Sequence, residues 1–148
     1  MTEQRAYQFP LAELIDSLTI AQIKEVLLSA DKDAESGTAE ISPIRQLTHD
    51  IDILMQEKQV KLTGRMVRLI MLLAQLNLSV WNYKDAMQRQ PDEYDSLLER
   101  AQELNGLRNH TINLLMEGFG ENEPCHTKAT FLDYSGGKWY SDILTSLD

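Results

Sequence analysis

The sequence has one cysteine, few basic residues for its length and no long apolar run. Because Cys125 stands alone, a disulfide within the chain is excluded, and this cysteine usage is typical of a reducing cytosol. The first ten residues, MTEQRAYQFP, contain no apolar core of a secretory signal peptide. The most apolar stretch, 69–81, is interrupted by Gln75 and Asn77 and is shorter than the roughly 20 residues that cross a bilayer. We therefore expect a cytoplasmic protein without a membrane span.

The charge balance is strongly acidic, with 23 Asp and Glu against 14 Lys and Arg, and a formal net charge of -9. A protein that binds nucleic acid unaided needs a basic stripe that displaces counterions. Anionic membrane surfaces repel an acidic protein for the same reason. We expect no direct binding of nucleic-acid duplexes or membranes, and the acidity is compatible either with solubility or with docking onto a basic protein partner.

A chain of 148 residues with 43% hydrophobic content is long enough for one sizeable core and short for two. We expect a single domain over residues 1–148, with a helical core at 10–118 and a tail at 119–148. Apolar residues recur at helical spacing through that core, as in Leu11, Leu14, Ile15 and Leu18. Four main helices are predicted, at about 10–29, 42–58, 64–89 and 92–117.

Capping residues and prolines set the expected helix ends. Ser42, followed by Pro43, is a typical helix start, and Asp92 is the predicted N-cap after the break at Pro91. The third helix is apolar nearly all round, which favours a central place in the bundle. The predicted fold is therefore all-α, an antiparallel bundle of four main helices. The aromatic residues of its irregular tail predict that the tail packs on the bundle; they are Phe131, Tyr134, Trp139 and Tyr140.

Several polar residues fall on helix faces that a plain bundle would fill with apolar side chains. The heptad-like seam of the fourth helix has Asn105 and Arg108 at its centre. A buried arginine needs a carboxylate or a ligand anion, and Asp16 and Asp85 are the candidates. On the third helix, a ridge of residues spaced by four consists of Asn77, Trp81, Asp85 and Arg89. The predicted internal cluster comprises Asp16, Lys24, Asn77, Trp81, Asp85, Arg89, Asn105, Arg108 and Asn109.

Two interpretations of this cluster remain open. In the first, the residues hydrogen-bond one another and fix the register of the helices. In the second, they line a polar pocket in which arginines hold an anionic group, amides orient the ligand and Trp81 is a stacking wall. Under the second interpretation, Arg108→Ala should abolish binding and leave a folded bundle.

The order of these motifs resembles a known family. The segment from Glu13 to Lys24, ELIDSLTIAQIK, is similar to the E-L-I-D-x-L-T-I-x-x-I-K opening of a family of small uncharacterised helical bacterial proteins. The spacing of Asn77, Trp81, Asp85 and Arg89 continues the likeness, which covers about residues 9–117. The chain departs from the family at two positions: Lys84 replaces an acidic residue, and Gly106 replaces the aspartate of an Asn-Asp-x-Arg pattern that ends at Arg108. The resemblance implies a helical fold and names no substrate.

Catalytic motifs are sparse. His49 and Asp50 match the metal-binding dipeptide of HD-type phosphohydrolases, but no second paired signature accompanies them, which favours a solvated pair on a helix. A magnesium-dependent phosphohydrolase would require Asp16, Asp50, Asp52 and Asp85 to converge. We expect no resident metal or cofactor.

The leading hypothesis is a non-enzymatic binding protein with a helix-lined pocket for a small polar or anionic ligand, such as a nucleotide or a sugar phosphate. The alternative is an acidic protein-interaction module, either an adaptor or an inhibitor. A metal-dependent helical phosphohydrolase is the third hypothesis. A homodimer is compatible with all three.

Overall fold

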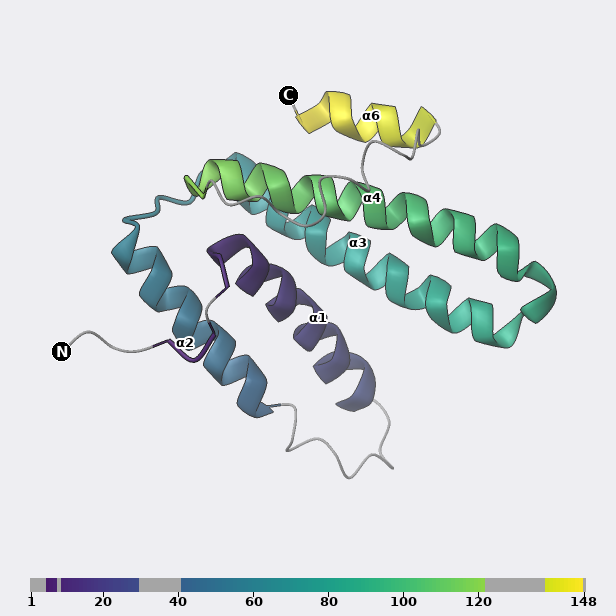
Figure 1. Cartoon of the computed structure of the whole chain (residues 1–148), viewed down its shortest axis with the longest axis horizontal. Coiled ribbons are helices and arrows are strands. Elements are labelled where there is room, and N and C mark those ends of the chain that lie inside the picture. Colours follow the sequence, from purple (N-terminus) through teal and green to yellow (C-terminus); the bar gives the residue numbers. More distant parts are fainter. Residues whose placement is uncertain (1–4, 8, 30–40, 122–137, 148) are drawn as a thin grey trace.

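The computed structural model describes residues 5–7, 9–29, 41–121 and 138–147, and every regular element in that part of the chain is a helix (Figure 1). The prediction of an all-α fold is therefore confirmed. The elements are α1 (Leu11–Ser29), α2 (Ile41–Glu57), α3 (Gly64–Arg89), the short 3-10 helix η2 (Pro91–Glu93), α4 (Tyr94–Gly118) and α6 (Lys138–Leu147).

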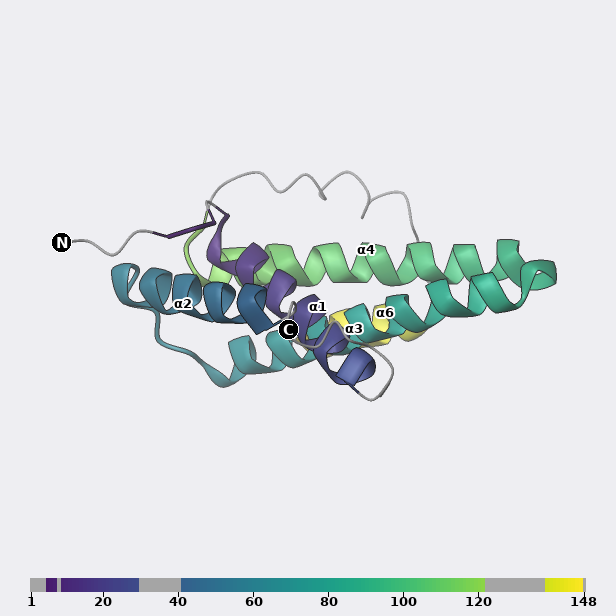
Figure 2. The ribbon, with the colours of Figure 1, turned by 90° about the horizontal axis from the view of Figure 1, so that it is seen from below.

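Helices α3 and α4 form a long hairpin, and they lie side by side in opposite directions on either side of η2 (Figures 1 and 2). Helix α1 lies between α2 and this hairpin and packs against all three helices. The hairpin extends beyond the end of α1, so that its tip projects into solvent (Figure 1). The prediction that α3 is the central helix is wrong, because Val67, Met71 and Leu78 on one flank of α3 are exposed.

The core consists of leucines and other aliphatic side chains from the four long helices. Leu11 and Leu14 of α1, Leu69 and Leu73 of α3 and Leu115 of α4 are fully buried. Each buried leucine contributes about 1.5–3 kcal/mol relative to an exposed one. A smaller apolar cluster further along the hairpin joins α3 to α4 through Leu76, Val80, Leu104 and Leu107. The hairpin therefore has apolar contacts of its own beyond the reach of α2.

The helix starts differ in detail from those predicted. Helix α2 begins at Ile41, so Ser42 lies within its first turn and does not precede it. Asp92 lies in η2, and the N-cap of α4 is Glu93, without a side-chain capping bond. The prediction for α2 placed the cap just before Pro43 and the prediction for α4 placed it just after Pro91, whereas the chain already turns helically at or before each proline. Thr63 does cap α3, because its Oγ1 accepts a hydrogen bond of 3.2 Å from the Met66 N–H.

Helix α6 is the helical part of the C-terminal tail, and it contacts the core through Leu147, which is buried, and Ile143, which is half-buried. Arg65 Nε donates to the Leu147 carbonyl at 3.3 Å, and Arg68 Nη2 donates to Ser146 Oγ at 2.7 Å. Cations at a helix C-terminus are favourable because the carbonyl ends carry partial negative charge.

The predicted packing of the aromatic tail residues stays a prediction. Phe131 and Tyr134 lie outside the described residues, and so do the side chains of Trp139 and Tyr140. Among the helices that the structure describes, none is long and apolar enough to cross a membrane.

Candidate functional site

A buried amide links the first and third helices. Asn77 of α3 donates through Nδ2 to Asp16 Oδ1 at 2.8 Å and to Thr19 Oγ1 at 2.6 Å. The Thr19 hydroxyl in turn donates to the Asp16 carbonyl at 2.7 Å, one turn back on α1. All three residues are buried. Because buried polar groups are costly without partners, these bonds fix how α1 sits against α3.

Arg108 of α4 completes the network from the other side of the hairpin. Its Nε donates to Asn77 Oδ1 at 2.7 Å, its Nη1 to Asn109 Oδ1 at 3.2 Å, and its Nη2 to Asp16 Oδ2. The side chain of Arg108 is 22% exposed and that of Asp16 is 11% exposed. Asp16 is thus the carboxylate that neutralises Arg108, and Asp85, the other candidate, is not. We call Asp16, Thr19, Asn77, Arg108 and Asn109 the polar network.

Three predicted cluster members lie elsewhere. Asp85 and Arg89 form an ion pair with each other on the surface of α3, and both side chains are more than half exposed. Their prediction as internal residues is wrong, because the tip of the hairpin extends past α1 and leaves that end of the ridge in water. Lys24 lies on α1 two turns beyond Asp16, about 12 Å along the helix axis. Within the described residues, no hydrogen bond or ion pair joins Lys24 to the polar network.

A hollow of about 270 Å³ adjoins the polar network, and we call it the polar pocket. It is bounded by α1, α3 and α4. Its polar lining residues are Asn77, Trp81, Lys84, Asn105 and Arg108, and its apolar lining residues are Ile20, Ile23 and Val80. The pocket therefore gathers four residues of the predicted cluster at one place, together with a lysine that the prediction left out.

Some polar residues that line the polar pocket already make hydrogen bonds within the protein, and others make none. Asn77 and Arg108 are held in the polar network. In the part of the chain that the structure describes, no hydrogen bond or ion pair is made by the side chains of Trp81, Lys84 and Asn105. Because both charged lining residues are basic, the mouth of the pocket favours an anionic group.

Two residues of the site, Thr19 and Lys84, are absent from the cluster that we predicted from the sequence, although the spacing of each one indicated its position. Thr19 lies three residues after Asp16 and so shares its face of α1. Lys84 lies seven residues, close to two helical turns, after Asn77, so that it projects from the same side of α3. A step of seven residues from Asn77 along α3, in addition to the steps of four used for the prediction, identifies Lys84.

A second buried carboxylate, Asp50 of α2, ties the N-terminal segment to the bundle. It is fully buried, and Oδ2 accepts from the Tyr7 N–H at 2.8 Å while Oδ1 accepts from the Ala6 N–H at 3.3 Å. Gln46 Nε2 lies 3.0 Å from Oδ1, and His49 Nδ1 lies 3.2 Å from it. The interpretation of His49 and Asp50 as a solvated pair is therefore wrong for Asp50.

These bonds also determine how readily Asp50 ionises. Burial favours the neutral acid, but the hydrogen bonds from the Tyr7 N–H, His49, Gln46 and the Ala6 N–H outweigh burial and lower the pKa of Asp50 below its usual value. Asp50 is therefore an anion at neutral pH, and its charge is stabilised mainly by neutral donors.

The described residues contain no group of three or more His, Cys, Asp or Glu side chains arranged to hold a metal ion. The convergence that a phosphohydrolase would require does not occur, because Asp16, Asp50 and Asp85 engage different partners in different parts of the molecule. Asp52 is exposed on α2. The single cysteine, Cys125, lies outside the described residues.

Comparison of the chain with protein-family models, curated proteins and solved structures finds no match. The resemblance to a family of helical bacterial proteins therefore stays a prediction. Any function proposed for the chain rests on the geometry of the site.

Proposed function

We propose that this chain is a non-enzymatic binding protein whose polar pocket takes a small ligand with one anionic group, of the size of a sugar phosphate. The observation that carries the proposal is the set of unengaged polar groups around the pocket, Trp81, Lys84 and Asn105. Polar groups that converge on a hollow without partners of their own favour a ligand that supplies those partners.

The charges favour an anion held chiefly by Lys84. Arg108 is already neutralised by Asp16, so its remaining N–H groups contribute hydrogen bonds and little net charge. Lys84 is exposed at the pocket and has no carboxylate partner among the described residues. A flexible ammonium suits a phosphate oxygen as a point charge.

The size of the pocket narrows the ligand class. Pockets for drug-sized ligands measure about 300–1,000 Å³, and this one is about 270 Å³. A sugar phosphate therefore fits better than a dinucleotide. The Trp81 indole offers a flat apolar wall for a sugar ring, and Asn105 offers both a donor and an acceptor for hydroxyl groups.

Calorimetric titration with glucose 6-phosphate, and with glucose as the neutral counterpart, tests the proposal. We expect saturable binding of the phosphate ester and at least tenfold weaker binding of glucose. Lys84→Gln should reduce the affinity for the ester about tenfold or more, as expected for the loss of a charged hydrogen bond of about 1.5–3 kcal/mol. Arg89→Gln is the matched control, because it removes a cation from the same helix away from the pocket.

Native mass spectrometry of gently purified protein extends the test to ligands outside that pair. A bound molecule below about 300 Da with an anionic group, lost in Lys84→Gln and retained in Arg89→Gln, supports the proposal. Equal loss of affinity in both variants contradicts it, because the pocket would then have no special part in binding.

A further inference from the structure

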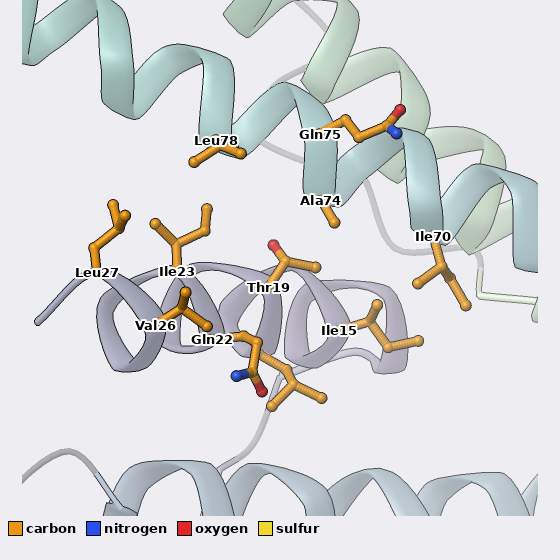
Figure 3. A pocket seen from close by; sticks show the side chains of 11 residues that line it. Ile15, Thr19, Gln22, Ile23, Val26, Leu27, Ile70, Ala74, Gln75 and Leu78 are labelled. Atoms are coloured by element: carbon orange, nitrogen blue, oxygen red, sulfur yellow. The ribbon is translucent and has the colours of Figure 1, made fainter. Parts of the chain in front are cut away.

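Two hollows lie against α3, and they differ in what adjoins them. The first, of about 490 Å³, is lined by residues of α1 and α3 alone (Figure 3). The second, of about 350 Å³, lies between α3 and α6, and its lining consists of Ile143 of α6 and six residues of α3 between Gly64 and Gln75. A helix of this chain therefore already lies on the flank of α3 at the second hollow, and it shows what kind of element that flank accepts.

Helix α6 is held by two apolar anchors and two arginines. Leu147 is buried in the core, and Ile143, one turn earlier, contacts both apolar clusters of the bundle. Arg68 Nη1 donates to the Ser146 carbonyl and Arg65 Nε to the Leu147 carbonyl, so that both guanidinium groups meet the last turn of α6. We call the surface of α3 that bears these contacts the α6 seat; it comprises Arg65, Val67, Arg68, Met71 and Leu72.

The α6 seat is larger than the side chain that α6 places beside it. The hollow of about 350 Å³ remains open next to Ile143, and at its edge Val67 is 44% exposed and Met71 is 59% exposed. Atoms that border an unfilled space lose dispersion contacts, and exposed apolar side chains gain free energy when a neighbour removes them from water. A helix with a larger side chain at the position of Ile143 would therefore bind the seat more tightly than α6 does.

Helix α6 also depends on the seat for its own structure. It has ten residues, and isolated helices shorter than about 12–15 residues are marginal in water. Formation and docking of α6 are therefore coupled, and the entropy cost of ordering the helix offsets part of the free energy of docking. A helix that is already formed within a folded partner avoids this cost.

The same contacts disfavour a second copy of the chain as the occupant. The α6 of a second copy also carries Ile143 and leaves the same hollow, so it gains nothing over the chain's own α6. The chain's own helix, in contrast, meets the seat at an effective concentration far above that of a micromolar protein solution. An occupant that displaces α6 must therefore differ from it in sequence.

We propose that the α6 seat is a docking site for a helix of another protein, and that α6 is an intramolecular competitor which this helix displaces. The partner helix carries an aromatic residue that fills the hollow beside Leu72 and a leucine four residues later, the spacing of Ile143 and Leu147 in α6. Its last carbonyl groups accept hydrogen bonds from Arg65 and Arg68. The proposal does not rest on the ligand of the polar pocket.

A larger side chain within the chain itself tests the fit of the seat. Ile143→Phe should slow hydrogen exchange of the amides in the last turn of α6 by about fivefold or more, because the ring fills the hollow. Asp142→Phe is the matched control, because it places the same ring at an exposed position of α6, and it should leave exchange unchanged. Exchange that is unchanged or faster in Ile143→Phe contradicts the proposal.

Binding by a separate helix is measured by fluorescence anisotropy with two labelled peptides of about 14 residues. Each begins with an alanine-rich turn and ends with the sequence of residues 138–147; one keeps isoleucine at the position of Ile143, and the other has phenylalanine there. We expect the phenylalanine peptide to bind the full-length chain about fivefold more tightly or better. Ile143→Asp in the chain, which releases its own α6, should tighten binding of this peptide by about tenfold or more.

Variants of the seat locate the binding surface. Arg68→Gln, introduced together with Ile143→Asp, should weaken binding of the phenylalanine peptide by about fivefold or more, because a charged hydrogen bond to the helix end is lost. Arg45→Gln in the same background is the matched control, because Arg45 is exposed on α2 and does not belong to the seat. Thermal unfolding monitored by circular dichroism checks that each variant folds.

Three outcomes of the peptide experiments overturn the proposal. The two peptides bind equally well, or Ile143→Asp leaves the affinity for the phenylalanine peptide unchanged. In the third outcome, sedimentation velocity finds a wild-type dimer that Ile143→Asp dissociates, so that a second copy occupies the seat. Tighter binding of the phenylalanine peptide, weakened by Arg68→Gln and retained with Arg45→Gln, sustains the proposal.

Discussion

Asp16 and Asp50 are both buried carboxylates, yet they are stabilised by different kinds of partner. Asp16 faces the guanidinium of Arg108 and the amide of Asn77, so that an ion pair lies between α1, α3 and α4. Asp50 faces two backbone N–H groups and the side chains of Gln46 and His49. One carboxylate is stabilised by a full opposite charge, and the other mainly by neutral donors.

This difference in partners determines how much stability a substitution at each carboxylate or at its partners costs. Removing one member of a buried ion pair leaves the other charge without compensation, whereas removing a carboxylate held by N–H groups leaves only unsatisfied donors. The charge of Asp16 is therefore stabilised by the side chain of Arg108, which is distant in sequence. The charge of Asp50 is stabilised in part by the backbone N–H groups of Ala6 and Tyr7. Substitutions at the carboxylates and at their partners separate these two dependencies.

The largest effect is expected from Arg108→Leu, which leaves Asp16 buried without its cation. We expect a loss of about 3–5 kcal/mol in the free energy of unfolding, measured by urea denaturation. The pocket interpretation of the sequence predicted a folded bundle without Arg108, and the pairing with Asp16 now predicts a large loss of stability.

Two controls sharpen the measurement. Arg89→Leu breaks an exposed pair and should cost no more than about 1 kcal/mol. The double variant Asp16→Leu with Arg108→Leu should recover part of the loss, because the uncompensated charge is then gone. A double variant less stable than the sum of the two single changes contradicts this account.

Asp50→Ala should have the next largest effect, a loss of about 1–3 kcal/mol, because the Ala6 and Tyr7 N–H groups lose their acceptor. Hydrogen exchange at these two amides should accelerate together. Asp52→Ala is the matched control on the same helix, since Asp52 is exposed, and it should change stability by less than about 0.5 kcal/mol. Unchanged exchange at residues 6 and 7 contradicts the role given to Asp50.

The pH dependence of stability provides a test of Asp50 without loss of its volume. Because the folded-state pKa is lowered, the carboxylate stabilises the fold above its unfolded-state pKa of about 3.9. This contribution is lost as the pH falls from there through the folded-state pKa. Urea unfolding at a series of pH values should show a steeper decline below about pH 4 in the wild type than in Asp50→Asn. Parallel curves contradict the assignment.

Glu121 extends the comparison to a third carboxylate, with the smallest expected effect. Its two oxygens accept from the Leu11 N–H at 2.6 Å and the Ala12 N–H at 3.0 Å, at the start of α1. Glu121→Gln keeps one acceptor oxygen, so we expect a loss of about 0.5–1 kcal/mol. Glu117→Gln, an exposed change in the last turn of α4, is the control. Equal losses in both variants contradict a capping role.

The helical pattern was enough to predict the class of fold and much of the polar network. Apolar spacing located α1 and α3 to within about one residue of their observed bounds. Asn77 and Arg108 lie on facing seams of α3 and α4, and the need of a buried arginine for a carboxylate left Asp16 and Asp85 as candidates, of which the structure selects Asp16. These features follow from periodicity and charge, which are properties of the sequence itself.

The remaining features depend on how far one helix extends beside another. Asp85 continues the ridge of Asn77, but α1 does not reach it, and no local pattern in α3 records the length of its neighbour. Asp50 and Glu121 were missed for a different reason. Their partners are backbone N–H groups, which every residue except proline carries, so no side-chain motif marks them.

The bond from Glu121 to the start of α1 has a consequence for the order of events during synthesis, because 110 residues separate Glu121 from Leu11. Ribosomes add about 5–20 residues per second, so the first turn of α1 exists for roughly 5–20 s before the residue that caps it has been made. During that interval α1 and α2 emerge with an open helix end. Glu121, three residues beyond the end of α4, closes that end, and completion of the first helix therefore waits until the whole of α4 has been made.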